Sequence, residues 1–500
     1  MEILGNLVLG FGVALSPFNL FMCLVGTLLG TLIGVLPGVG PTATIAMLLP
    51  ITFTLSPIGA LIMLAGIYYG AQYGGSTTSI LLNLPGEASS IVTCLDGYEM
   101  ARQGRAGPAL ATAALGSFFA GCVSTLLLAM FAPALSRVAL EFGPAEYFSL
   151  MVFGLIAATV LARGSLIKAI AMVVLGLLLG LVGTDRSSGM VRFGFNVFEL
   201  SDGIGVVTVA MGMFGITEII SSLERQGERR VLIDKVRHLW PTREDVRRAW
   251  PSVLRGTALG SVLGVLPGGG ALLASFASYA LEKKVSAHRD EFGRGAIEGV
   301  AGPESANNAG AQTSFVPLLT LGIPANSVMA LMFGAMMIQG IVPGPQVMTE
   351  KPQLFWGLIA SMWIGNLMLV VLNLPLIGMW IKLLTVPYRL LYPAILLFMC
   401  IGVYSVSNQP FDALLMAFFG LLGYVCIKLD CEPAPAILGF ILGPLVEENL
   451  RRAMVISRGD PTVLVQTPIS AGFLIAAAVL VVIIALPNIR KKREEAFVES

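Results

Sequence analysis

The sequence has little charge. Only 12% of its 500 residues are Asp, Glu, Lys or Arg and 56% are hydrophobic, whereas soluble proteins carry roughly 25% charged residues. This composition excludes a water-soluble globular protein. One membrane-spanning helix needs roughly 20 mostly apolar residues, and apolar stretches run nearly from end to end of this chain. We therefore predict an all-α integral membrane protein with about ten or more crossings.

The sequence also lacks the residues of a metal or catalytic centre. Its six cysteines include no CxxC pair, so neither a zinc site nor a disulfide framework is expected. The two histidines, His238 and His288, lie in charged stretches, and no GxxxxGK[ST] phosphate loop is present. Lys and Arg number 31 against 30 Asp and Glu, so nothing indicates a nucleic-acid partner. We expect no enzymatic activity, no catalytic residue and no organic cofactor.

One segment of the chain occurs twice. Residues 26–40 (GTLLGTLIGVLPGVG) and 256–270 (GTALGSVLGVLPGGG) are identical at ten positions, at a constant offset of 230. Weaker similarities follow in the same order. Duplicated membrane proteins are typically transporters built from two related halves. We predict a first repeat in 1–222, a basic cytoplasmic connecting loop in 223–255, a second repeat in 256–450, and an extra helix with a basic cytoplasmic tail in 451–500.

The distribution of Lys and Arg predicts how these halves are oriented, because cytoplasmic loops are enriched in both. No Lys or Arg precedes Arg102, whereas basic stretches flank the second copy on both sides. Each copy is broken at its centre by Pro-Gly, which is typical of a re-entrant hairpin. Hairpins entering from opposite faces make the two halves inverted-topology repeats. The N-terminus is then periplasmic and the C-terminus cytoplasmic.

The predicted crossings fill the rest of the chain. Three arginines, at 451, 452 and 458, fall on the outside in this count, and the segment before Phe18 either lies on the surface or crosses. The crossings are expected near 57–87, 107–136, 146–162, 166–183, 203–221, 296–323, 353–381, 389–406, 411–428, 433–449 and 463–487.

Irregular backbone at membrane depth is tolerated only where protein or a water-filled cavity satisfies its polar groups. We predict hairpin tips near 36–42 and 266–271, and broken helices in 57–87 and 296–324. The helix breaks are expected at 73–79 and 302–308, each followed by a Pro-containing turn. Helix N-termini at such breaks favour an anion, Ser, Thr and Asn side chains donate to a carboxylate, and free carbonyl groups ligate a small cation.

The candidate site residues come from these breaks. The predicted substrate-binding residues are Gly38, Thr42, Ser76, Thr77, Thr78, Asn83, Gly268, Gly269, Asn307, Asn308, Thr313 and Ser314, and the predicted Na⁺ ligands are Gly40, Gly270, Glu304 and Asn307. Simpler interpretations stay open: the repeated glycines can serve close helix packing alone, the Pro-Gly tips can be plain kinks, and Glu304 can cap a helix.

Charge balance predicts a coupling ion. Two or three helix termini supply roughly one to one and a half positive charges, and no Lys or Arg lies in the four breaks. A bound di- or tricarboxylate would stay under-neutralised. We therefore predict co-transport with Na⁺ or H⁺.

A succession of motifs resembles a known family. The segments GVLPGVGPTATIAMLLP, YGGSTTSILLNLPGEASSIVTCLDGYEMARQG, FGPAEYFSLMVFG, GVLPGGGALLASFASYALEKK, GVAGPESANNAGAQTSFVPLLTLGIP, IVPGP and ILGFILGPLVEENLRRAMVISRGD are similar to the large membrane subunit of the tripartite tricarboxylate transporters (TctA family). The resemblance covers essentially the whole chain. It does not supply ligand residues, so the site residues above rest on the helix breaks.

The resemblance implies a subunit of the bacterial inner membrane that works with a small four-helix membrane subunit and a periplasmic solute-binding protein. It also implies cation-coupled import of citrate or other tri- or dicarboxylates without ATP, by an elevator-like carrier that moves a substrate-holding domain against a scaffold. Two alternatives stay open. One is a self-sufficient carboxylate carrier without partners. The other is an intramembrane enzyme, which the absence of an intramembrane His or Asp pair disfavours.

Overall fold

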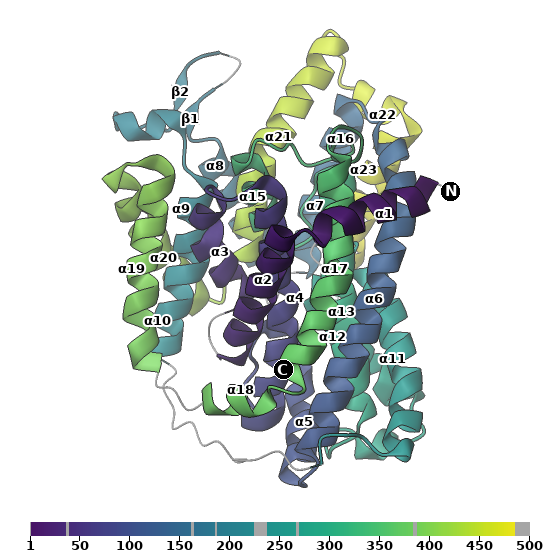
Figure 1. The fold of residues 1–500 in the computed structure, drawn as a ribbon. Coiled ribbons are helices and arrows are strands. Elements are labelled where there is room, and N and C mark those ends of the chain that lie inside the picture. The colour runs from purple at the N-terminus through teal and green to yellow at the C-terminus, as the bar shows by residue number, and fades with distance from the viewer. Residues whose placement is uncertain are drawn as a thin grey trace.

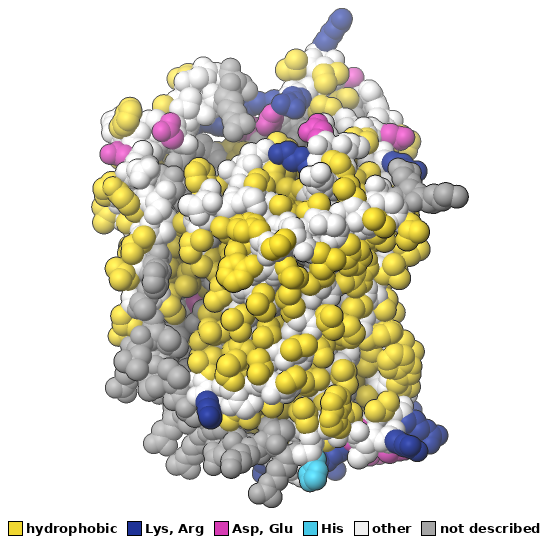
Figure 2. Space-filling view, in the orientation of Figure 1, with side chains coloured by type: hydrophobic (Ala, Val, Ile, Leu, Met, Phe, Trp, Pro, Cys, Tyr) yellow, Lys and Arg dark blue, Asp and Glu magenta, His cyan; other side chains and the backbone are white. Residues whose placement is uncertain are grey.

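The computed structural model describes residues 2–36, 40–161, 165–185, 188–224, 238–266, 270–383 and 388–485. These residues form a bundle of helices, with one small ribbon of two antiparallel strands, β1 (Gly183–Thr184) and β2 (Val191–Arg192) (Figure 1). Hydrophobic side chains cover the middle of the visible face, and charged side chains gather at its upper and lower ends (Figure 2). Such an apolar band between polar ends is expected where lipid surrounds a protein. The chain is therefore a helical membrane protein.

The helices of the first half follow the predicted crossings closely. They are α1 (Glu2–Ala14), α2 (Pro17–Val35), α3 (Pro41–Thr52), α4 (Pro57–Leu82), η1 (Ala88–Ser90), α5 (Ile91–Arg102), α6 (Ala106–Ala139), α7 (Pro144–Leu161), α8 (Leu166–Gly180), η2 (Phe198–Asp202), and a last helix made of α9 (Val206–Ala210), the π-helical turn η3 (Met211–Ile216) and α10 (Thr217–Glu224).

The second half repeats much of this order. Its helices are α11 (Arg243–Leu263), α12 (Gly270–Val285), η4 (Arg289–Glu291), α13 (Glu298–Thr313), α14 (Phe315–Leu321), α15 (Ser327–Ile338), α16 (Gln346–Glu350), α17 (Pro352–Asn373), α18 (Ile377–Leu383), α19 (Tyr388–Ser407), α20 (Pro410–Lys428), α21 (Ala434–Ile456), α22 (Val463–Gln466) and α23 (Pro468–Ala485). By length and composition, α2, α6, α17 and α20 are each able to cross a membrane, and several shorter helices are as apolar.

The repeated glycines bring helix backbones into contact. They lie against the next long helix of their own half: Gly26, Gly30 and Gly34 of α2 against α4, and Gly256, Gly260 and Gly264 of α11 against α13. A Cβ on Gly30, for example, would stand 2.5 Å from the carbonyl oxygen of Ile67. The packing interpretation of these glycines is confirmed, since only a residue without a side chain fits there.

Two predicted helix breaks are wrong. The helix α4 runs unbroken through 73–79, and α13 runs unbroken through 302–308. Small residues are tolerated there because neighbouring backbone packs against the glycines, and the Ser76 hydroxyl bonds back to the carbonyl of Gln72 at 3.1 Å. The bends come later, at Asn83 (φ 55°) and Gly322 (φ 70°). Each bend leads to a helix that the sequence did not predict, α5 and α15.

The first helix lies on the bundle surface. In Figure 1 α1 runs across α17 rather than alongside it. Gly10 packs against the backbone of Trp356, and Phe11 stacks on Trp363 with ring centroids 5.8 Å apart. Val8, on the outer side, is 69% exposed. The segment before Phe18, which the sequence left open, therefore rests on the bundle.

Two of the arginines that the crossing count places outside, Arg451 and Arg452, are paired with acids. Arg451 contacts Glu447 at 2.6 Å and Asp185 at 3.2 Å, and Arg192 of the ribbon contacts the same Glu447 at 2.8 Å. Arg452 pairs with the glutamate one turn before it. The end of α21 thus stands beside the β ribbon at the upper end of Figure 1 as a locally balanced network. The predicted tail beyond 485 and part of the basic loop, 225–237, lie outside the described residues.

Replacing Gly260 by Val should destabilise the protein, because the new side chain would overlap the backbone of Ala306. Overpacking of this kind costs about 1–3 kcal/mol, and here the obstacle is backbone. We expect a clear fall in the unfolding temperature of the detergent-solubilised protein, measured by tryptophan fluorescence. Gly12→Val is the control, since no atom lies within 4 Å of its Cβ position. Equal unfolding temperatures would contradict the close contact.

Candidate functional site

Helices from both halves begin at one place. The Oγ1 atom of Thr42, in the first turn of α3, lies 3.4 Å from Oγ of Ser327, the first residue of α15. A Cβ on Gly270, where α12 begins, would lie 3.1 Å from Nδ2 of Asn326. Asn326 caps α15 by accepting a hydrogen bond from the backbone N–H of Met329 at 2.9 Å. The starts of α3, α12 and α15 therefore meet around residues 326–327.

A short turn packs against one of these helices. The short turn η1, which leads into α5, packs against α12, and Glu87 caps that turn. Each helix start carries partial positive charge from unpaired N–H groups. The predicted hairpin tips before α3 and α12, with the candidate residues Gly38, Gly268 and Gly269, lie outside the described residues. The described residues that follow them, at the starts of α3 and α12, both lie near residues 326–327.

A fully buried carboxylate lies among these helices. Glu304 on α13 is 0% exposed. Its Oε2 accepts hydrogen bonds from Ser76 Oγ at 2.5 Å and from Asn307 Nδ2 at 3.2 Å, and its Oε1 accepts one from Thr93. The three donors come from α4, α13 and α5. Within the described part of the chain, no Lys, Arg or His forms an ion pair with Glu304.

A second carboxylate stands nearby. Glu87 is 9% exposed and accepts a hydrogen bond from Ser89, whose hydroxyl also lies 2.7 Å from Oε1 of Gln72. Its charge interacts with that of Glu304. A Cβ on Gly75 would approach the Glu87 side chain to 2.9 Å, so this glycine makes room for it. The centre thus holds two acids with hydroxyl and amide neighbours.

Amide groups continue the polar face of α13. Asn308 Nδ2 donates to Ser117 Oγ of α6 at 2.8 Å and to Asn307 Oδ1 at 2.7 Å. The Oδ1 atom of Asn308 and both amide atoms of Gln312, one turn further on, are buried without a hydrogen-bond partner. An unpaired buried polar group costs about 1–3 kcal/mol. Such atoms mark a place where a ligand or water completes the hydrogen bonding.

A small cavity opens beside Ser76. Its volume is about 10 Å³, and it is lined by Tyr73, Ser76, Thr77, Leu110, Ala113, Ala114 and Asn373. Asn373 is 4% exposed, and its Oδ1 has no hydrogen-bond partner. The space suits about one water molecule. A di- or tricarboxylate is much larger, so its binding at this point requires the surrounding helices to move.

The remaining candidate residues serve packing or helix ends. Thr78 donates to the carbonyl of Val35 at 2.8 Å, which joins α4 to α2. Thr313 packs against Gly264, and Ser314 donates to the carbonyl of Ala311 at 2.7 Å. The exposed Asn83 ends α4.

The four candidate Na⁺ ligands fall into two groups. Glu304 and Asn307 share a hydrogen bond, whereas Gly40 and Gly270 stand at the starts of α3 and α12. In the described residues, no group of three or more His, Cys, Asp or Glu side chains is placed to hold a metal ion. A cation bound here would depend on hydroxyl, amide and backbone oxygens.

The sequence did not indicate several polar residues of this centre as site residues. They lie on helices that read as plain crossings or as a loop, and their partners are far away in the sequence. A single buried polar residue in an apolar helix was the available signal. The missed residues are Gln72, Glu87, Ser89, Thr93, Ser117, Gln312, Asn366 and Asn373.

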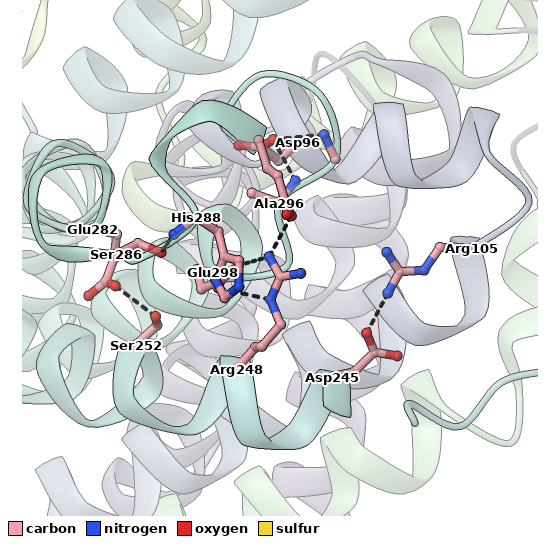
Figure 3. Close-up of polar contacts among 12 residues, drawn as sticks. Asp96, Arg105, Asp245, Arg248, Ser252, Glu282, Ser286, His288, Ala296 and Glu298 are labelled. Atoms are coloured by element: carbon pink, nitrogen blue, oxygen red, sulfur yellow. Dashed lines mark hydrogen bonds and ion pairs between the residues drawn. The ribbon is translucent and has the colours of Figure 1, made fainter. Parts of the chain in front are cut away.

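A different kind of polar cluster lies at the start of α13. Asp96 of α5 is fully buried, and its Oδ1 accepts hydrogen bonds from the backbone N–H groups of Gly293 (2.8 Å), Gly295 (2.9 Å) and Ala296 (2.9 Å). Its Oδ2 accepts one from the hydroxyl of Tyr279 at 2.9 Å. Figure 3 shows Asp96 reaching this segment, which precedes α13. The first half of the chain is thereby fixed to the second.

Ion pairs surround this attachment (Figure 3). Arg248 forms a two-pronged pair with Glu298, at 3.0 and 2.9 Å. Arg105 of the first half pairs with Asp245 in the first turn of α11. Burial alone would raise the pKa of Asp245, but hydrogen bonds from Thr242 and the guanidinium of Arg105 hold it below its usual value. In contrast to Glu304, the acids at this end have cationic or backbone N–H partners.

Comparison with known proteins decides the family. Residues 20–438 match the model of the tripartite tricarboxylate transporter TctA family. The chain belongs to this family. TctA proteins are the large subunits of tripartite systems, so this TctA chain is a transporter component that has partner subunits.

Two relatives of this TctA chain come from Agrobacterium vitis. An uncharacterized 52.8 kDa protein in the TAR-I ttuC' 3'region is 63% identical over 499 residues, which cover 100% of the chain and 99% of that protein. An uncharacterized protein in the TAR-II ttuC' 3'region is 65% identical over 240 residues, which cover 48% of the chain and 99% of that protein. No solved structure matches the chain.

Asn308→Ala should lower transport without unfolding the protein. The change removes the amide that joins Asn307 to Ser117 and the unpaired Oδ1 atom. We expect about a tenfold loss of substrate uptake, which corresponds to ~1.4 kcal/mol. Asn19→Ala is the matched control, since Asn19 is also buried but bonds only to the carbonyl of Val13 in the contacts described. Uptake equal to wild type would remove Asn308 from the site.

Proposed function

We propose that this TctA chain is the transmembrane subunit that carries a di- or tricarboxylate, such as citrate, across the bacterial inner membrane by symport with Na⁺ or H⁺. A periplasmic solute-binding protein delivers the anion, and a small four-helix membrane subunit completes the system. The observation that carries the proposal is that the starts of α3, α12 and α15, which come from both halves, meet at one place.

The site fits a carboxylate that arrives from water. The N-terminus of α3 has no side-chain cap, and the starts of α12 and α15 add partial positive charge at the same place, although Asn326 caps α15. Thr42, Ser327 and Asn326 add neutral donors at the same place. Because these partial charges are permanent but weak, they hold an anion without trapping it as a buried lysine or arginine would.

The same site calls for a coupling cation. Glu304 and Glu87 already place two acids beside the helix starts. A di- or tricarboxylate adds two or three more negative charges in a medium that penalises net charge. A cation that enters together with the substrate offsets this penalty, and its gradient then drives import.

Two equivalent helix pairs support an inverted repeat. The pair α2 and α4 and the pair α11 and α13 are joined through glycines at the same spacing. Each pair is followed by a bend with positive φ and a further short helix. We assign the two repeats to 1–222 and 256–450, related by a pseudo-twofold axis in the membrane plane. The hairpin-bearing part then moves past a scaffold, as in an elevator.

The partner proteins distinguish this proposal from a self-sufficient carrier. If the chain works alone, purified protein moves substrate without the small subunit or the binding protein. Family membership favours the assisted system, because TctA proteins are subunits of tripartite transporters. An enzymatic role has no comparable support, since the fully buried acid Glu304 contacts only hydroxyl and amide donors in the described residues.

Reconstitution tests the proposal directly. The chain and its two partners in proteoliposomes should accumulate radiolabelled citrate or another di- or tricarboxylate when a Na⁺ or H⁺ gradient is imposed. Collapse of the gradient with an ionophore should abolish accumulation. Liposomes that lack the small subunit should transport little. Failure with every carboxylate that the cognate binding protein retains would overturn the function, and full activity of the chain alone would favour the self-sufficient carrier.

The predicted orientation has its own test. The exposed Phe195, which follows β2, and His288, which precedes η4 and contacts Glu298 at the start of α13, should face opposite sides of the membrane. Phe195→Cys should react with an impermeant maleimide added to intact spheroplasts, and His288→Cys should react only in inverted vesicles, after subtraction of the labelling of the native cysteines. Reaction of both from one side would contradict the assigned topology.

A further inference from the structure

We propose that the coupling ion is a proton, that Glu304 carries it, and that the cavity beside Ser76 is its point of entry. This inference rests on the proposed symport and decides between the two ions that the charge argument left open. It depends on three features of the described residues: the partners of Glu304, the space around it, and the position of Ser76.

The partners of Glu304 are all neutral. The hydroxyls of Ser76 and Thr93 and the amide of Asn307 reach its two oxygens. Taking a carboxylate out of water without a counter-charge is strongly unfavourable. A proton on Glu304 removes the charge and requires no added volume. The hydroxyls of Ser76 and Thr93 can remain bonded to the neutral acid, because a hydroxyl both donates and accepts.

The space around Glu304 disfavours a metal cation. A hard cation takes several oxygen ligands at once, usually with a carboxylate among them. The water-sized cavity is lined by Ser76, Thr77, Tyr73 and Asn373 but not by Glu304. Both oxygens of Glu304 are already held by donors from three helices. A metal ion in the cavity would thus be separated from the charge that should hold it.

Ser76 connects the cavity to Glu304. It lines the cavity, and its hydroxyl donates to Glu304 Oε2 at 2.5 Å. The buried Oδ1 of Asn373 has no partner and lines the same cavity, which points to a water molecule there. A hydronium ion in the cavity gives a proton to Ser76 Oγ while Ser76 gives its own proton to Glu304 Oε2. The products are a water molecule, an unchanged serine and a neutral carboxylic acid.

The other groups around Glu304 fit this role. Three titratable side chains interact with it electrostatically: Glu87 before α5, Cys94 on α5 and Tyr73 on α4. Like Glu304, Glu87 is buried and accepts a hydrogen bond from a neutral hydroxyl, that of Ser89. On the α6 and α17 sides, the neutral residues Ser117 and Asn366 face this region.

Another acid that contacts α13 is already paired with an arginine. Glu282 of α12 lies beside Gly302 and forms a two-pronged ion pair with Arg255 of α11. At the start of α13, Glu298 is paired with Arg248. Glu304 is therefore the acid of α13 whose charge is not balanced by an arginine in the described residues.

Proton uptake also explains coupling to the substrate. A neutral Glu304 carries its own hydrogen, which takes the place of one donor. The longest of the three hydrogen bonds, which Asn307 Nδ2 donates at 3.2 Å, is the one most easily lost. Its release frees an amide donor for the carboxylate of the substrate. Substrate binding and proton binding then favour each other.

Glu304→Gln tests the inference, because glutamine keeps the shape of the neutral acid but cannot carry a proton. Proteoliposomes with both partner proteins should be assayed in two ways. In counterflow, labelled substrate exchanges with internal substrate and no gradient is needed, so the variant should retain at least about half of the wild-type rate. Under an imposed pH gradient, wild type should accumulate substrate at least tenfold, and the variant should only equilibrate it.

A direct measurement follows the ion itself. A pH-sensitive dye trapped inside the liposomes should report acidification when substrate is added to wild type, and no acidification with Glu304→Gln. Glu350→Gln, on the exposed helix α16, is the matched control and should behave as wild type. If Glu304→Gln does not yield folded protein, Ser76→Ala tests the same route and should slow acidification more than counterflow.

The outcomes separate this inference from the proposed function. Accumulation that follows a Na⁺ gradient at constant pH, without acidification, overturns the proton and leaves symport standing. Loss of counterflow in a folded Glu304→Gln variant assigns Glu304 to substrate binding and likewise overturns the inference. Absence of both counterflow and accumulation in wild type, for every carboxylate tested, overturns the proposed function itself.

Discussion

Backbone contact along glycine-lined helix faces is the constraint on which the rest of the molecule depends. Because α2 and α11 present glycines to α4 and α13, the backbones of these helices approach closely. The polar residues of α4 and α13 are thereby placed close to one another. Ser76 and Glu304, 228 positions apart, meet only because both helices are held in this way.

The buried acids in two polar regions of the bundle have different kinds of partner. At the end shown in Figure 3, arginines and backbone N–H groups satisfy the buried acids, which stabilises the junction of the halves. In the centre, Glu304 has only neutral donors, and amide atoms of Asn308 and Gln312 lack partners. A stable fold alone does not need such atoms. Departures of this kind from complete pairing are expected where a protein binds something else.

The sequence predicted the features that are encoded locally. Apolar length predicted the helices, and the repeated glycines predicted the close helix pairs. The sequence misled where local propensity and tertiary packing disagree. Gly74, Gly75 and Ser76 break a helix in water, but between packed helices they allow contact and the helix continues.

Other residues of the site were beyond sequence reasoning for a different reason. Thr93 and Asn373 are single polar residues in helices, and nothing near them in the sequence shows that they face Glu304 or its cavity. The short helices α5 and α15 read as loops because each follows a bend and spans only 12 residues. Family membership, in turn, came from the order of motifs and not from any single contact.

The hydrogen bonds between Asp96 and the segment before α13 limit how the two halves can move. The Asp96 side chain, in the first half, accepts hydrogen bonds from three backbone N–H groups of the second half, so the two halves are joined at this point. Neither half can slide past the other without breaking these hydrogen bonds. In the elevator mechanism proposed above, the boundary between the moving part and the scaffold would therefore run through each half, with a share of both halves on either side.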